Sequence, residues 1–101
     1  MREAAGILEV FGCVAAFVAA DAAAKAANVR IESIDKNKPA NADSLPVPLI
    51  TCLKIRGSVA DVEAAMEAGA AAAEALTGVI TKHFIPAPAE DTEKMLRISA
   101  I

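Results

Sequence analysis

Few side chains in this sequence suit metal binding or nucleophilic catalysis. Cys13 and Cys52 lie 39 residues apart without a CxxC motif, and His83 is the single histidine. A zinc site needs about four ligands, commonly Cys or His at close spacing. We therefore expect no metal site, no catalytic residue and no bound cofactor. We interpret both cysteines as reduced, small apolar side chains.

Acidic side chains are scattered and form no paired constellation for acid–base chemistry. We interpret the following as solvated helix surfaces or salt-bridge partners: Asp21, Glu63, Glu67 and Glu74. Gly6 and Gly12 do not form the G-x-G-x-x-G pattern of a phosphate-binding loop. The residues thus predict no enzymatic activity.

Net charge and hydropathy exclude two further classes. The chain carries a net charge of −3 with a pI near 5.0, whereas nucleic-acid-binding domains are normally basic. No run of about 18 residues lacks a charge, so no membrane span is expected. A signal peptide begins with a cationic region and continues with an apolar one, but here the acidic residues Glu3 and Glu9 occupy these regions. We expect a cytoplasmic protein that binds neither nucleic acid nor membrane.

The residue pattern predicts four strands and three helices. Alanine, the strongest helix former, dominates the first two helices. Asp21 and Lys25 form a favourable i,i+4 pair, and Ser58 with Asp61 forms a variant capping box. The expected elements are strands at 5–11, 29–35, 49–56 and 79–85, helices at 13–27, 59–76 and 89–97, and a proline-containing loop at 36–48.

Hydrophobic periodicity assigns faces to these elements. In the first helix, Val14, Phe17 and Val18 form one stripe, but Asp21 and Lys25 continue it, so that end is not expected in the core. We expect Asn28 to cap this helix. Strand 29–35 should place Val29, Ile31 and Ser33 on one face. The second helix should bury Val59, Val62, Met66, Ala73 and Leu76.

The element order β-α-β-β-α-β predicts one domain over residues 1–101. This α+β pattern is typical of a ferredoxin-like sandwich, with two helices on one face of a four-stranded antiparallel sheet. The chain has 25 alanines but only three aromatic residues, so a core of its own has few large anchors. Small, flat surfaces favour a self-assembling structural domain. A small-ligand-binding regulatory module of the same fold remains the alternative.

Four sequence blocks resemble the single-domain, hexamer-forming class of bacterial microcompartment shell proteins, the BMC domain family. They are GILEV at 6–10 followed by Gly12, AADAAAKAANV at 19–29, RGSVADV at 56–62 leading into EAGAAAA at 67–73, and HFIPAP at 83–88. The blocks span nearly the whole chain in the usual order, without circular permutation. Together they form a strong signal.

The resemblance implies a flat homo-hexamer that tiles with other hexamers and shell proteins into a shell around enzymes. Small metabolites would cross through a central pore lined by loop 36–49. The implied pore-loop residues are Asp35, Lys36, Asn37, Lys38, Asn41, Asp43 and Ser44. The implied hexamer-edge residues are Lys25, Asn28 and Glu74. A shell homologue that binds enzyme tails instead of tiling is a further alternative.

Three features depart from the family pattern. Thirteen residues, Asn37 to Leu49, precede Ile50, which is long for this loop. Glu74 and Ala87 stand where many members carry arginine. The long loop predicts a pore that is narrowed or capped; the alternative is a flap that folds over one face.

Overall fold

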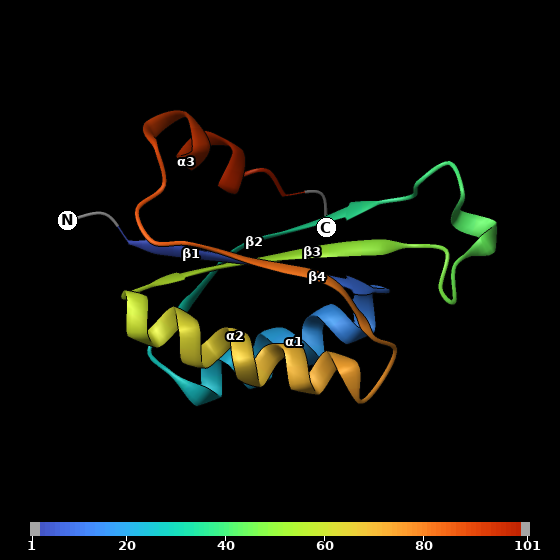
Figure 1. The fold of residues 1–101 in the computed structure, drawn as a ribbon, viewed down its shortest axis with the longest axis horizontal. Helices are drawn as coiled ribbons and strands as arrows, with labels where there is room; N and C mark the ends of the chain where they lie inside the picture. Colours follow the sequence, from blue (N-terminus) through green and yellow to red (C-terminus); the bar gives the residue numbers. More distant parts are fainter. Residues whose placement is uncertain (1–2, 100–101) are drawn as a thin grey trace.

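A computed structural model of the chain describes residues 3–99. The elements in chain order are β1 (Ala4–Phe11), α1 (Cys13–Ala26), β2 (Arg30–Asn37), a 3₁₀ turn η1 (Ala42–Ser44), β3 (Ile50–Gly57), α2 (Val59–Glu74), β4 (Val79–Ile85) and α3 (Glu90–Leu96). All strand pairs are antiparallel, in the order β2-β3-β1-β4. Helices α1 and α2 cover one face and α3 lies on the other (Figure 1). The predicted α+β sandwich is therefore confirmed.

The core lies between the sheet and the helix pair. Leu8 and Leu53 of the central strands are buried against alanines of α1 and against Val62 and Met66 of α2. The two helices approach so closely at Gly69 that a Cβ on this residue would stand only 3.1 Å from the carbonyl oxygen of Ala19. Small side chains thus let the helix backbones pack where large ones would separate them.

Helix α1 turns alanines toward the core and its large apolar side chains toward solvent. Val14 is 71% exposed and Phe17 51%, and Val18 is exposed as well. In α2, the predicted burial of Val62, Met66 and Ala73 is confirmed. For Val59 and Leu76 it is wrong, because these residues lie at the first position of α2 and beyond its end.

Two local expectations for the segment after α1 are wrong. A bulge between Ile31 and Ser33 interrupts the alternation of β2, so Ile31 packs against the core while Ser33 donates to the carbonyl of Leu96 at the end of α3 (2.6 Å). Asn28 does not take the left-handed conformation of a helix cap, since Ala27 before it is already extended. Instead its backbone N–H donates to Asp61 (3.4 Å).

Polar side chains of the sheet hold α3 in place. Lys54 of β3, although buried, donates to the carbonyl of Ile98 (2.7 Å). Arg56, also of β3, is only 2% exposed and contacts Glu93 of α3. The apolar contribution to this contact comes from Leu96, the buried residue of α3. Charged and polar contacts thus carry much of the docking of this short helix.

Candidate functional site

The connection between β2 and β3, residues 38–49, is the most prominent feature outside the sandwich. Figure 1 shows it extending past the ends of the strands, roughly in line with the sheet. It does not fold back over either sheet face, as a flap would. The segment therefore forms the surface of the molecule at this end.

Internal hydrogen bonds give this loop a defined shape. The backbone N–H of Ala42 donates to the carbonyl of Pro39 (3.0 Å), and that of Leu45 donates to the carbonyl of Ala42 (3.1 Å). The backbone N–H and the hydroxyl of Ser44 both donate to the carbonyl of Asn41 (3.0 and 2.8 Å). These bonds close the η1 turn and bury Ala42 within it.

The returning limb of the loop is fixed to the turn between β1 and α1. The backbone N–H of Gly12 donates to the carbonyl of Leu49 (2.9 Å). Gly12 has φ 89° and ψ 158°, a combination that is essentially restricted to glycine. A side chain here would also contact Val47, whose Cγ1 lies 3.4 Å from the position of a Cβ. This glycine therefore ties the base of the loop to the sandwich.

The structure divides the predicted pore-loop residues between strand and loop. Asp35, Lys36 and Asn37 lie in β2, because pairing with β3 continues as far as Asn37 opposite Ile50. The strand therefore begins one residue later and ends two residues later than predicted. The other four belong to the projecting segment and are exposed: Lys38, Asn41, Asp43 and Ser44.

Helix α1 ends at the opposite end of the molecule from the loop (Figure 1). Lys25 is the second-last residue of this helix, and Asn28 follows two residues after its end. The side chain of Lys25 is 76% exposed and its ammonium forms the predicted ion pair with Asp21 (2.7 Å). Exposed pairs of this kind are worth only a few tenths of a kcal/mol, roughly 0.3–0.5. Breaking this ion pair would therefore cost little free energy, and the ammonium can contact another molecule.

Glu74 is not close to these two residues. It lies at the last position of α2, at the end of the molecule that carries the loop (Figure 1). Its Oε2 accepts a hydrogen bond from the backbone N–H of Val79 (3.0 Å), across the turn into β4. The structure therefore assigns Glu74 a local contact and separates it from Lys25 and Asn28.

The cysteines are free. Cys13 accepts a hydrogen bond from the hydroxyl of Thr51 (3.8 Å). Cys52 stands directly opposite Glu9 on β1 and Asp35 on β2. Burial raises the pKa of the Cys52 thiol; Glu9 and Asp35 raise it further, while Lys54 opposes the shift. The sulfur of Cys52 is therefore a poor nucleophile in the folded chain.

Residues 3–99 contain neither a metal-binding cluster nor a membrane-spanning helix. No group of three or more His, Cys, Asp or Glu side chains there could hold a metal ion. No helix in this part of the chain has the length and apolar character to cross a membrane.

Sequence reasoning missed the contribution of Arg56 and Lys54. Both are buried charged residues in β3, and each reaches a residue in or after α3. The only sequence signal is two basic residues within an otherwise apolar strand, which a half-exposed strand would explain equally well. Their partners lie 37 and 44 positions away, beyond any local pattern.

Comparison with known proteins identifies the family. The BMC domain model matches residues 4–88. The chain is 41% identical to the bacterial microcompartment shell protein PduA of Citrobacter freundii over 94% of this chain and 92% of that protein. It is 38% identical to the carboxysome shell protein CcmK3 of Halothece sp., over 98% and 90%.

A solved structure of a microcompartment protein from Desulfitobacterium hafniense matches with a TM-score of 0.74 and 28% identity. The match covers 93% of this chain and 48% of that one. The relatives favour a structural shell role over a regulatory ligand-binding module. With a family match that includes both the projecting loop and the Lys25 end, the chain belongs to the BMC domain family of bacterial microcompartment shell proteins.

Proposed function

We propose that this protein is a non-enzymatic shell subunit that forms hexamers in the bacterial cytoplasm, and that the hexamers tile into a microcompartment shell. The observation that carries the proposal is the family match across residues 4–88. Residues 1–101 act as one unit in this assembly. Neighbouring hexamers, other shell proteins and enclosed enzymes are its partners. No bound cofactor is needed for this role.

The two ends of the molecule have different roles in this assembly. Six copies of segment 38–49 surround the central axis, with Asp35, Lys36 and Asn37 at its base. The opposite end, with Lys25 and Asn28, faces the next hexamer. The distance between these ends, with a long molecular extent of 42 Å, supports this division. Glu74 is left out of the edge because it lies near the loop end.

The projecting loop narrows the pore. Because the segment extends beyond the strands and is held by its own hydrogen bonds, six copies bring a preformed collar toward the axis. Lys36 and Lys38 offset Asp35 and Asp43, so the collar carries little net charge. Small polar metabolites are the class of molecule that this opening would pass.

Electron microscopy and native mass spectrometry of the purified full chain test the proposal. The expected results are a six-copy mass and flat sheets with hexagonal repeats. A protein that stays monomeric or dimeric at all concentrations, with a tight site for a small metabolite, would contradict it.

A further inference from the structure

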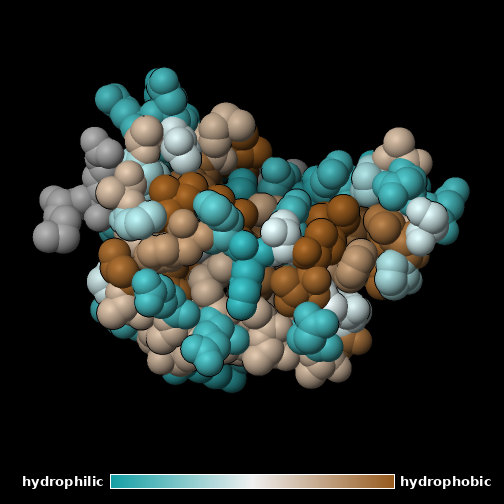
Figure 2. All heavy atoms as spheres, in the orientation of Figure 1, coloured by the Kyte–Doolittle hydropathy of each residue, from teal (hydrophilic) through white to brown (hydrophobic). Residues whose placement is uncertain are grey.

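Three connecting segments meet at the base of the projecting loop. They are the β1–α1 turn at Gly12, the α2–β4 turn at 75–78 and the returning limb of the loop at 45–49. Val47 and Leu49 of this limb are half-buried, and Figure 2 shows hydrophobic surface where the loop joins the body of the molecule. Hydrophobic contacts are not directional. They hold the loop against the sandwich without fixing the angle at which it projects, so directional hydrogen bonds must set that angle.

The peptide group between Phe11 and Gly12 connects these segments. Its carbonyl oxygen accepts a hydrogen bond from the hydroxyl of Thr77 (2.7 Å), and its N–H donates to the carbonyl of Leu49 (2.9 Å). Because a peptide group is planar and trans, its carbonyl and its N–H point in opposite directions, and the orientation of one fixes that of the other. The hydroxyl of Thr77 therefore acts on the base of the loop through a single rigid unit.

The backbone alone determines the orientation of this peptide group only weakly. Gly12 has φ 89°, and glycine adopts positive and negative φ about equally well. The Phe11–Gly12 peptide group can therefore rotate to the opposite orientation, in which its N–H would point away from Leu49. The hydrogen bonds at its two ends thus select the observed orientation.

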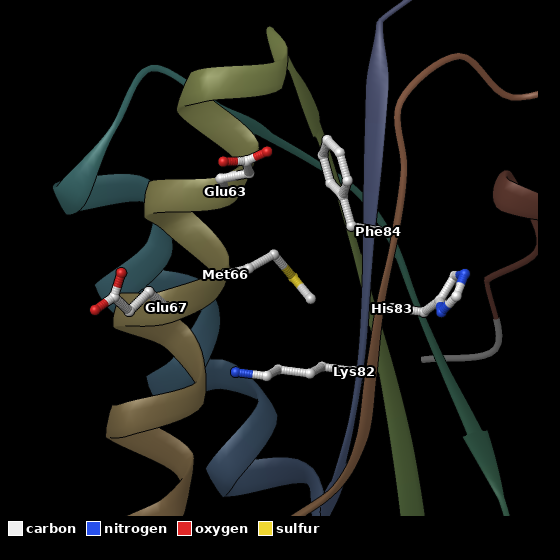
Figure 3. Close-up of a pocket in the computed structure, with 6 residues that line it drawn as sticks. All are labelled: Glu63, Met66, Glu67, Lys82, His83 and Phe84. Carbon is white, nitrogen blue, oxygen red and sulfur yellow. The ribbon is translucent and has the colours of Figure 1, made fainter.

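Thr77 lies on a turn that is itself firmly held. The three successive backbone N–H groups of residues 76–78 donate to the carbonyl of the buried Ala73 (3.0 to 3.1 Å). Figure 3 shows Phe84 of β4 pointing toward α2 and Met66 of α2 reaching toward β4, so the elements on both sides of the turn pack together. Thr77 is exposed and its side chain adds little to the core. Its hydroxyl is thus a fixed donor outside the core.

We infer that Thr77 is a positioning residue for the pore: its hydroxyl holds the Phe11–Gly12 peptide group, and through Leu49 this group sets the angle of loop 38–49. The effect on the opening rests on the proposed hexamer, but the contact itself lies within one chain. Around a six-fold axis, the same change of angle would be repeated in all six loops. One exposed hydroxyl outside the loop thereby controls the width of the opening.

Hydrogen exchange of single amides, measured by NMR on the full chain, tests the contact. Thr77→Val removes the hydroxyl and keeps the branched shape, whereas Thr77→Ser keeps the hydroxyl. In Thr77→Val the Gly12 amide should exchange about three- to tenfold faster than in the wild type, the factor expected for one lost hydrogen bond. Thr77→Ser should retain the wild-type rate. Thr81→Val, at an exposed position of β4, is the matched control and should also retain it.

Two further readouts separate positioning from a general loss of stability. Leu53 lies in the central strand β3 and is fully buried, so exchange of its amide reports opening of the sandwich. Its rate should stay within about twofold of the wild-type rate in Thr77→Val. The η1 turn keeps its own hydrogen bonds, so the loop should move as one body. Cryo-electron microscopy of Thr77→Val hexamers should show displaced or weakened density for loop 38–49, and Thr77→Ser hexamers should match the wild type.

The outcomes distinguish this inference from the proposed function. A wild-type exchange rate at Gly12 in Thr77→Val would overturn the inference in any oligomeric state. Equal acceleration at Gly12 and Leu53 would also overturn it, because the loss of protection would then be general. Unchanged loop density in Thr77→Val hexamers, despite faster exchange at Gly12, would show that the contact does not position the loop. If the wild type forms no hexamer, the proposed function fails, and the exchange rates still decide whether Thr77 holds the peptide group.

Discussion

The guanidinium group of Arg56 and the carboxylate of Glu93 form a two-point ion pair, with N···O distances of 2.7 and 2.6 Å. Arg56 also donates to the carbonyls of Glu3 (3.0 Å) and Ala4 (3.2 Å) and to the carboxylate of Glu32 (3.4 Å). One buried side chain thus joins β1, β2, β3 and α3. The hydrogen bond with Glu93 is the largest cause of the raised pKa of Arg56, which keeps the group charged.

Replacing Glu93 by glutamine should strongly destabilise the protein. The buried Arg56 would keep its charge and lose its main counter-ion, which typically costs about 2–4 kcal/mol. Urea unfolding of the full chain measures the loss. Asp91→Asn is the matched control, because Asp91 is on the same helix but almost fully exposed; it should change stability by less than about 0.5 kcal/mol. Equal effects of both variants would show that the Arg56 contact is weak.

Alanine at position 12 should be poorly tolerated. Gly12 has a positive φ of 89°, and forcing another residue into that region costs about 1–3 kcal/mol. The urea midpoint should fall by the corresponding amount, and the returning limb near Val47 should exchange its amide hydrogens faster. Ser44→Ala, within the loop itself, should leave the midpoint nearly unchanged. An unaltered midpoint in Gly12→Ala would disprove the backbone argument.

Stability should depend on the Cys52 thiol at alkaline pH. Burial raises the pKa of this thiol above the ordinary value of 9.0, so the folded state favours the neutral form. Its contribution is fully present below pH 9.0 and is lost as the pH rises through the folded value. The free energy of unfolding of Cys52→Ala should therefore fall less steeply above that pH. Parallel pH profiles for the two proteins would contradict this.

Lys25→Asp should abolish sheets and leave hexamers intact. At the proposed edge, the methylene stem packs against a neighbouring hexamer while the ammonium reaches an acceptor, and an aspartate offers neither contact. Electron microscopy shows whether sheets form, and native mass spectrometry shows whether hexamers form. Lys94→Asp is the matched control, since Lys94 is similarly exposed and also forms an intrahelical ion pair, with Asp91 (3.4 Å). Normal sheets from Lys25→Asp would remove this residue from the edge.

Shortening the loop should open the pore. Replacing residues 39–46 by Asn-Gly removes the η1 turn and keeps the strand ends that frame it. The hydrogen bond from Gly12 to Leu49 remains, so the base of the loop should keep its position on the sandwich. Six-fold assembly should therefore persist. Cryo-electron microscopy of sheets should then reveal a wider opening on the axis than in the wild type. An opening of unchanged width would mean that the loop does not line it.

The sequence predicted the element order and the sandwich well, because alanine-rich helices and alternating strands leave local signals. It did not predict which way α1 faces. Alanine suits both a tight helix contact and a solvated surface, so Ala19 and Ala24 look alike in sequence. The bulge at Ser33 depends on α3, and the extra length of β2 depends on pairing with β3. Both are set by contacts between distant segments rather than by local preference.

The placement of the candidate site was predictable only in part. Family motifs located the loop and the Lys25 end, but they grouped Glu74 with that end. Only the antiparallel arrangement of α1 and α2 reveals that α2 ends at the end of the molecule where α1 begins (Figure 1).

Because Val14 and Phe17 point outward, the stability of one chain should depend on the concentration of the protein. A partner that covers these side chains binds the folded state alone, and by mass action it raises the free energy of unfolding as concentration rises. The melting temperature should therefore climb with protein concentration. In the proposed assembly, chains that have not yet bound a neighbour should be the most sensitive to proteases.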